Sequence, residues 1–401
     1  MFPSRRHFAH RGDASASIVT DPGRELLESL SRINTYNPPV HTCSTGWSFA
    51  GFYSGPTSIA YLFYRLSLIY PDTEFKQQSF RDWAVDYLKL GARAPAKKPD
   101  PSHCGIANEL LSSLALRSVM SDDPNLAEQI CAFERMINGN DEGSNEWLYG
   151  RAGYLYLLRL CRSHFQKQTG SQPIVLLLTQ TIERTVQRVL DEPLPWTWHG
   201  KEYVGAAHGY IGTITQIVLS RTHSHSLGLG DIVEKLLALQ FPSGNFPSSV
   251  KARYTEHDDR LVQFCHGGPG FAMSFNSIAA HFSVELQTRL QAAIEKARSD
   301  TWNRGLLTKP PCLCHGIAGN ALAFTQEEDR RFEQMLAYSS TQSMEQNAKL
   351  DPSRGIEKGW LQDAGRDDAF AGLFTGEAGR AWVWAVADAK LPRTCLGYND
   401  V

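Results

Sequence analysis

The chain has 401 residues, 42% of them hydrophobic, and a formal net charge of −2 at pH 7. Because acidic and basic residues are mixed along it, no broad basic surface for nucleic acid is expected. No apolar run approaches the roughly 20 residues that a transmembrane helix needs, so the composition favours a globular protein without a transmembrane segment.

The cysteines and the first residues bear on the cellular compartment. Eight cysteines in a chain of this length are too few for a disulfide framework, which favours a reducing, intracellular setting. The start, MFPSRRHFAHRG, lacks the apolar core of a signal peptide, and Phe2 excludes N-myristoylation. We therefore expect a cytoplasmic protein, and peripheral attachment to a membrane stays open.

The first elements are a tail and a helix. Residues 1–20, rich in Arg, His and Ser, are predicted to form a flexible N-terminal tail. A helix is expected next, with Asp21 as its N-cap and Pro22 in the first helical position. Its apolar residues fall on one face and are Leu26, Leu27, Leu30 and Ile33. Residues 35–50 return to turn-forming sequence.

From residue 55 onward the chain repeats a glycine turn followed by an apolar helix. The copies recur at intervals of 45 to 60 residues, a period typical of repeat architectures. The seven copies begin at Gly55, Gly105, Gly150, Gly209, Gly267, Gly316 and Gly376. Copies three to seven keep a second glycine three residues later, where the first two copies have Ser58 and Asn108.

Amphipathic stretches such as residues 174–190 and 284–294 lie between the turns, and strand alternation is scarce. Each copy is therefore expected to contain an outer amphipathic helix and an inner, more apolar helix. The terminal copies are as apolar as the middle ones and lack the polar caps of an open solenoid. The sequence predicts an all-α fold in which residues 21–401 form one domain closed into a ring. The glycine turns, with free backbone N–H groups, are expected at one end of it.

Two Cys-His-Gly motifs, at residues 265–267 and 314–316, carry the clearest chemical signal. Zinc takes thiolate sulfur and imidazole nitrogen, and a catalytic zinc site keeps three protein ligands and one open position. Cys265, Cys314 and His315 would make such a site. The adjacent ligands would need a loop, because neighbouring residues on a strand point to opposite faces. The alternative is two ordinary buried cysteines beside glycines that begin helices.

Several motifs together resemble one protein family. They are NEWLYGRAGYLYLL at 145–158, EYVGAAHGYIG at 202–212, PSGNFPS at 242–248, FCHGGPG at 264–270 and CLCHGIAGNA at 312–321. With them the chain resembles the LanC-like proteins, eukaryotic relatives of bacterial lantibiotic cyclases, from about residue 45 to the C-terminus. The resemblance implies an α/α toroid of seven inner and seven outer helices. It also implies one zinc ion held by Cys265, Cys314 and His315.

The resemblance implies roles for four further residues, and position alone adds Arg151. His208, in the AHG motif, corresponds to the histidine that moves a proton, with a structural histidine at a glycine turn as the alternative. His266 would be a second acid or would orient a ligand. Lys309 matches a basic residue of glutathione-binding relatives, and Arg366 matches another with a spacing that departs by about one residue. Arg151 lies at a turn expected to face the same end. Lys309 and Arg366 could each also be a solvated surface charge.

The implied activity is zinc-dependent addition of a thiol, glutathione, to dehydroalanine or dehydrobutyrine residues in proteins or peptides. Lys309 and Arg366 would hold the two carboxylates of glutathione. Glu146 matches an acidic residue of the cyclases only loosely and is expected to be solvated. Two other functions stay open, a non-catalytic glutathione- and zinc-binding adaptor and an α/α-toroid glycosidase. A glycosidase needs two opposed carboxylates, and Glu377 is the only acid within a glycine turn.

Overall fold

The computed structural model describes residues 6–8, 21–40, 47–93, 97–139, 142–221, 228–251, 258–344 and 371–401. In these residues the secondary structure is helical apart from isolated bridges and one antiparallel hairpin, β1 (Glu74–Phe75) and β2 (Gln78–Ser79). None of the described helices is both long and apolar enough to cross a membrane. The prediction of an all-α fold is confirmed.

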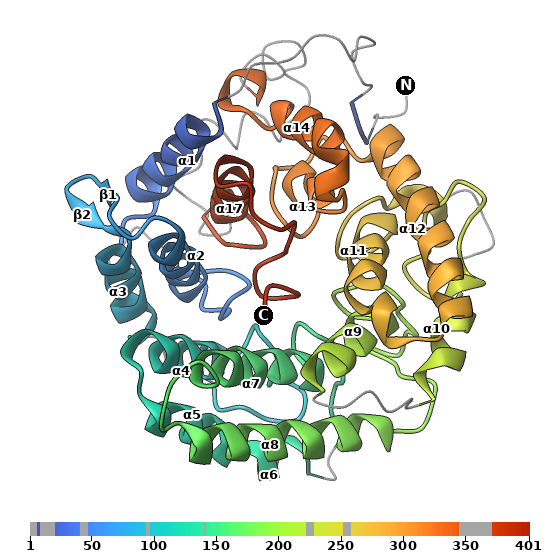
Figure 1. The fold of residues 1–401 in the computed structure, drawn as a ribbon, viewed down its shortest axis with the longest axis horizontal. Helices are drawn as coiled ribbons and strands as arrows, with labels where there is room; N and C mark the ends of the chain where they lie inside the picture. Colours follow the sequence, from blue (N-terminus) through green and yellow to red (C-terminus); the bar gives the residue numbers. More distant parts are fainter. Residues whose placement is uncertain are drawn as a thin grey trace.

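The helices form two concentric layers around a centre (Figure 1). The inner layer consists of α2 (Pro56–Ile69), α4 (Glu109–Ser121), α7 (Arg151–Phe165), α9 (Tyr210–Ser220), α11 (Gly268–Ile278), α13 (Ile317–Ala321) and α17 (Glu377–Asp388). The outer layer consists of α1 (Pro22–Tyr36), α3 (Phe80–Gly91), α5 (Pro124–Ala132), α8 (Gln172–Leu190), α10 (Leu229–Leu237), α12 (Val284–Arg304) and α14 (Asp329–Ala337). Short pieces lie between them, α6 (Glu134–Ile137), η1 (Asp258–Arg260), η2 (Ala279–His281) and η3 (Gln326–Glu328).

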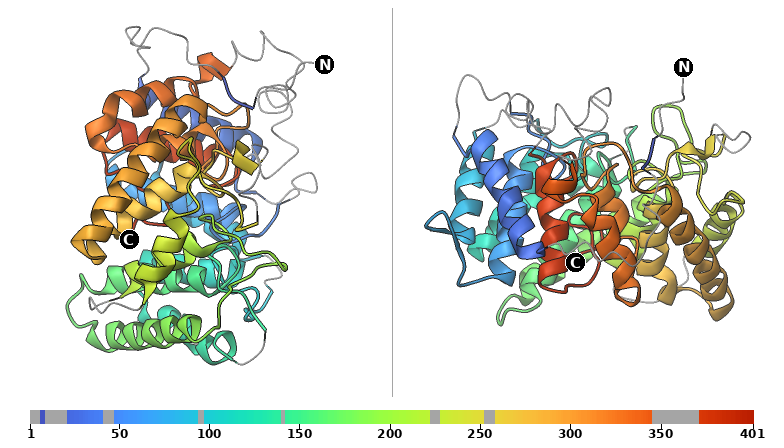
Figure 2. Two further views of the ribbon diagram at one scale, coloured as in Figure 1. Left: turned by 90° about the vertical axis from the view of Figure 1, so that its right-hand side faces the viewer. Right: turned by 90° about the horizontal axis from the view of Figure 1, so that it is seen from above.

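The ring is closed. Each inner helix contacts the next one along the chain, and α17 contacts both α13 and α2. The first outer helix, α1, packs against α17, so the beginning and the end of the described ring lie side by side (Figure 1). Figure 2 shows the ring edge-on, with helices running across its thickness. The predicted α/α toroid is therefore confirmed.

The first helix begins where its capping sequence predicts. Asp21 is the N-cap of α1, and its carboxylate accepts a hydrogen bond of 3.1 Å from the Arg24 N–H. Leu26, Leu30 and Ile33 are buried, but Leu27 is 44% exposed. Assigning Leu27 to the buried face was wrong, because it projects from the edge of the narrow stripe that faces the ring.

The two outer helices predicted from amphipathic stretches are both present. In α8 the predicted apolar side is buried at Ile182, Val186 and Val189. The helix α12 is longer than its predicted stretch and ends at Arg304, and Val284, its first residue, is 78% exposed. Ser283 caps α12 by accepting a hydrogen bond from the Leu286 N–H. Val284 therefore lies in the first turn of the helix, before Leu286, the first buried residue.

The glycine turns fold the chain back over the first turn of each inner helix. A Cβ atom on Gly319 would lie 1.9 Å from the carbonyl oxygen of Leu313, six residues earlier, so only glycine fits there. The same close approach recurs at Gly153, Gly212, Gly270 and Gly379. In copy two the helix begins later than its first glycine suggests, because Asn108 is the N-cap and accepts a hydrogen bond from the Leu111 N–H.

The C-terminal residues and residues 6–8 make contacts with the ring that the sequence did not indicate. The C-terminal residues lie at the centre of the ring (Figure 1), where the carbonyl oxygen of Tyr398 accepts hydrogen bonds from Arg159 and Gln216. Residues 6–8, inside the predicted flexible tail, pair with residues 306–308, and the Phe8 N–H donates to the Leu306 carbonyl at 2.7 Å. For these three residues the prediction of a flexible tail does not hold.

Candidate metal centre

The candidate residues occupy equivalent places on neighbouring glycine turns. His208, His266 and His315 each directly precede the glycine that caps an inner helix. Cys265 and Cys314 lie one residue further back. Backbone hydrogen bonds link these turns around the ring, including Cys265 N–H to the Cys314 carbonyl at 3.0 Å. Because the two turns are hydrogen-bonded at these residues, a cysteine at this place in both turns brings the two thiols close together.

Cys265, Cys314 and His315 come together as a group that could hold a metal ion. One donor atom from each, two sulfurs and an imidazole nitrogen, lie within 4.8 Å of one another. Zinc binds sulfur at about 2.3 Å and nitrogen at about 2.0–2.1 Å, so the donors suit one ion and leave a fourth position open. Both cysteines are buried and free of disulfides, as are the other cysteines that the structure describes.

Neighbouring groups and burial shift the pKa values of all three donors. A hydrogen bond from Cys314 and the proximity of His315 hold the pKa of the Cys265 thiol well below its ordinary value, despite burial. Burial disfavours the charged form of His315, but hydrogen bonds to Cys265 and Cys312 outweigh it and raise its pKa to about 10. At neutral pH the metal-free group therefore holds a thiolate, a protonated Cys314 thiol and an imidazolium.

Metal affinity is expected to rise steeply with pH. Ligands bind metals deprotonated, so an ion displaces one proton from Cys314 and one from His315. Both groups stay protonated between about pH 6 and 8 in the metal-free chain, so affinity should increase about 100-fold per pH unit over this range. Competition with a chelator at several pH values measures the slope, and an affinity that changes less than tenfold across the whole range would contradict this arrangement.

Two polar side chains that the sequence did not indicate support the sulfurs. The Tyr53 hydroxyl donates to Cys314 Sγ at 3.5 Å, and the Gln263 amide donates to Cys265 Sγ at 3.1 Å. Lys309 Nζ in turn donates to Gln263 Oε1 at 2.9 Å, which places this predicted substrate-binding residue beside the metal group. Tyr53 could have been found, because it lies two residues before Gly55, the place that Cys265 and Cys314 occupy in their own turns.

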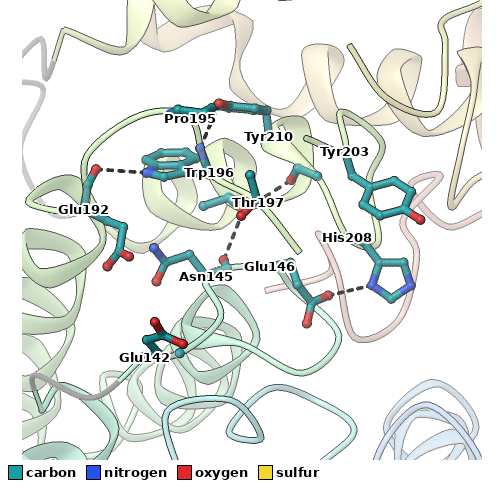
Figure 3. Close-up of a pocket in the computed structure, with 13 residues that line it drawn as sticks. Glu142, Asn145, Glu146, Glu192, Pro195, Trp196, Thr197, Tyr203, His208 and Tyr210 are labelled. Carbon is teal, nitrogen blue, oxygen red and sulfur yellow. Dashed lines mark hydrogen bonds and ion pairs between the residues drawn. The ribbon is translucent and has the colours of Figure 1, made fainter. Parts of the chain in front are cut away.

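His208 is held by a carboxylate. Its Nδ1 lies 2.9 Å from Glu146 Oε2 (Figure 3), and Glu146 also accepts hydrogen bonds from the backbone N–H groups of Leu148 and Tyr149. Glu146 is only 4% exposed, so the expectation that it is solvated was wrong. The pairing fixes the orientation of the ring and leaves Nε2 of His208 as the nitrogen available for proton transfer.

Aromatic rings surround the histidine pair. Trp198 stacks flat on His208, with ring centroids 3.9 Å apart and an angle of 3° between planes. His266, the residue after Cys265, lies on the side of His208 nearer the metal group, which we call the metal side. The ring centroids of His208 and His266 are 6.0 Å apart. Burial lowers the pKa of His266 below its ordinary value, and its Nδ1 has no hydrogen-bond partner among the described residues. His266 is therefore neutral at neutral pH, which argues against its use as an acid.

Of the two other predicted substrate-binding residues, the structure describes only Arg151. Arg151 is 0% exposed, and it donates to the Ile137 carbonyl and to Asn145 Oδ1 at 3.0 Å each. This burial contradicts the expectation that Arg151 faces a substrate, and the side chain braces the loop before α7 instead. A basic residue after a turn glycine does not by itself reveal which way its side chain points. Arg366 lies outside the described residues.

A cavity of about 310 Å³ opens on the side of His208 where Glu146 lies (Figure 3). We call it the acidic pocket. Its lining is Glu142, Gly143, Asn145, Glu146, Glu192, Pro195, Trp196, Thr197, Tyr203, His208, Gly209, Tyr210 and Thr213. Tyr203 lies between this pocket and the metal side, with its ring centroid 5.6 Å from that of His266. His208 and Tyr203 therefore lie between the acidic pocket and the metal group.

Comparison with known proteins found a family model, a relative and a solved structure that are similar to this chain. The family model described as lanthionine synthetase C-like protein matches residues 47–386. A protein of Danio rerio named glutathione S-transferase LANCL1 is 30% identical over 326 residues, 77% of this chain and 75% of the relative. The solved structure of nisin cyclase is similar with a TM-score of 0.53, and the match covers 93% of this chain and 94% of the cyclase. At 12% identity the cyclase supports the shared fold alone. The chain belongs to the lanthionine synthetase C-like family.

Proposed function

We propose that this protein is a zinc-dependent glutathione transferase that adds the glutathione thiol to dehydroalanine or dehydrobutyrine residues of proteins or peptides. The observation that carries the proposal is the group of Cys265, Cys314 and His315, three donors with an oriented histidine, His208, nearby. The name of the Danio rerio relative supports glutathione as the thiol. A cytoplasmic location is part of the proposal, because reduced thiols and glutathione coexist there.

A zinc ion held by this group would supply Lewis acidity that lowers the pKa of a thiol in the open position. The residues of the chain do the rest. His208 Nε2 can take up the thiol proton and later deliver it to the α-carbon of the acceptor, after sulfur has bonded to the β-carbon. Because Nδ1 of His208 is hydrogen-bonded to Glu146, Nε2 is the nitrogen that can exchange a proton with the substrates. The reaction consumes one thiol and one alkene and releases nothing.

The two other functions fit the site less well. A glycosidase needs a free pair of carboxylates at the mouth of the ring. Glu377 is 0% exposed and forms an ion pair of 2.5 Å with Arg380, so it is not available as an acid. An adaptor that binds zinc and glutathione without turnover needs no oriented proton carrier. The hydrogen bond between His208 and Glu146 favours an enzyme over an adaptor.

Lys309 is expected to contribute to the affinity for glutathione. Its ammonium, two hydrogen bonds from Cys265 Sγ by way of Gln263, can pair with a glutathione carboxylate. A charge-assisted hydrogen bond contributes about 1.5–3 kcal/mol, so Lys309→Met should weaken glutathione binding roughly 10- to 150-fold. Calorimetric titration at two salt concentrations measures this, and salt should weaken wild-type binding more than binding to the variant.

The matched control is Lys235→Met, which removes an exposed lysine of α10. Zinc content is measured in both variants, because Gln263 also contacts Cys265. Equal glutathione affinity in Lys309→Met and wild type would mean that the carboxylates are held elsewhere.

The experiment that tests the proposed function uses glutathione, a dehydroalanine peptide and purified protein, with mass spectrometry of the peptide. The zinc-loaded protein should form the glutathione adduct, the chelated protein should not, and restoring zinc should restore the adduct. If glutathione and zinc both bind while no adduct forms above the uncatalysed background, the protein is an adaptor and the proposal fails.

A further inference from the structure

The acidic pocket contains more than the proton carrier requires. Its lining includes three carboxylates, those of Glu142, Glu146 and Glu192, and no lysine or arginine among the described lining residues. Aromatic rings of Trp196, Tyr203 and Tyr210 complete the walls. Carboxylates combined with aromatic faces are the usual surroundings of a bound ammonium or guanidinium group.

The carboxylates differ in how far they are already neutralised. Glu146 faces His208 and two backbone N–H groups. Glu192 forms an ion pair of 2.6 Å with Arg188, which lies outside the lining. Glu142 is exposed, and no ion pair to a described residue involves it. The pocket therefore keeps a negative charge that a cationic ligand could neutralise.

The pocket has two ends. Figure 3 shows His208 and Tyr203 at one end and the carboxylates of Glu142 and Glu192 at the other. Trp196 is fixed near the acidic end, because its indole N–H donates to the Glu192 carbonyl at 3.2 Å and its ring stacks on Tyr210. A residue that receives a proton from Nε2 of His208 lies on the side of the ring away from Glu146, so a long side chain of a neighbouring residue is needed to reach the acidic end.

We propose that the acidic pocket binds a basic side chain of the acceptor, a Lys or Arg close in sequence to the dehydroamino acid. This inference rests on the proposed function, since it assigns the acceptor to the His208 side and the thiol to the metal side. A cavity of about 310 Å³ has room for one long side chain. It selects acceptors with a basic residue near the reacting alkene and disfavours acidic ones.

The test compares two dehydroalanine peptides that differ only in a lysine or an Nε-acetyl-lysine, placed at either of two positions on each side of the dehydroalanine. At the best position the lysine peptide should have a KM about fivefold to tenfold lower, because an ionic contact and a cation–π contact are lost on acetylation. The preference should shrink at high salt. Glu142→Gln should raise the KM of the lysine peptide to near that of the acetylated one.

The control is Glu128→Gln, which removes an exposed carboxylate of α5 outside the pocket and should keep the full preference. Glu146 is not substituted here, because it orients His208. Equal KM values for lysine and acetyl-lysine peptides at all four positions, with normal turnover, would overturn the inference while the proposed function stands.

Two further measurements separate the remaining explanations. Calorimetric titration of both peptides into wild type and Glu142→Gln reports binding even if no adduct forms. A lysine preference in binding without turnover keeps the pocket assignment and refutes the proposed function, whereas no preference refutes the assignment as well. The ammonium group of glutathione is the other source of a cation. If Glu142→Gln weakens glutathione binding and leaves peptide binding unchanged, the pocket holds the thiol substrate and the inference fails.

Discussion

His208→Ala is expected to lower the rate of glutathione addition by about 100- to 10,000-fold, the contribution typical of a general acid–base group. The reason is positional, since Glu146 holds Nδ1 at 2.9 Å and Trp198 covers one face of the ring. A side chain restrained on two sides delivers a proton from one atom, Nε2, in one direction. Alanine removes the proton carrier and leaves the metal donors in place, so zinc content and glutathione affinity should stay near those of wild type.

The matched control for this variant is His281→Ala, which removes an exposed histidine of η2. Initial rates from the mass-spectrometric assay, with zinc measured on the same samples, decide the outcome. Loss of zinc from His208→Ala would make the histidine a ligand or a structural residue. An unchanged rate would show that another group moves the proton.

Cys314→Ala is expected to abolish stoichiometric zinc binding and, with it, activity. Two donors remain in this variant, Cys265 and His315, and two donors bind zinc far more weakly than three. The fold should survive, because the Cys314 backbone N–H still donates to the Phe374 carbonyl at 3.0 Å and the inner helices still pack in a closed ring. Helix content should therefore change little.

The control is Cys161→Ala, which removes another fully buried thiol, in α7 and outside the metal group. It tests whether loss of any core cysteine releases metal by loosening the protein. Zinc analysis and circular dichroism of both variants are sufficient. One zinc per chain in Cys314→Ala would refute the ligand assignment, and a similar zinc loss in both variants would make the effect one of stability.

The repeat and the metal group could be predicted because both depend on local backbone chemistry. Five of the seven turns need glycine where a Cβ would strike a carbonyl six residues earlier, as at Gly319, so the fold leaves a regular pattern in the sequence. Adjacent turns are hydrogen-bonded at equivalent places, as Cys265 is to Cys314. Two identical motifs one repeat apart therefore reveal a shared site without knowledge of any side-chain packing.

The other parts of the site depend on contacts between distant segments. Glu146 and His208 are 62 residues apart in the chain, and nothing local marks them as partners. Trp198 reaches His208 from a loop before α9, and the direction of that loop has no sequence signature. Arg151 lies beside a turn glycine but points into the protein, because its neighbours supply carbonyl acceptors there. Position near a turn predicts proximity to the site, whereas side-chain direction is set by tertiary packing.

The central claim is an open metal centre with three protein donors, and X-ray absorption at the zinc edge tests it most directly. We predict two sulfurs, one imidazole nitrogen and one light atom around zinc in the purified protein, with a third sulfur appearing when glutathione is added. S-methylglutathione, which lacks a free thiol, should leave the spectrum unchanged. A zinc ion with four protein donors, or a sulfur count that glutathione does not alter, would contradict the account.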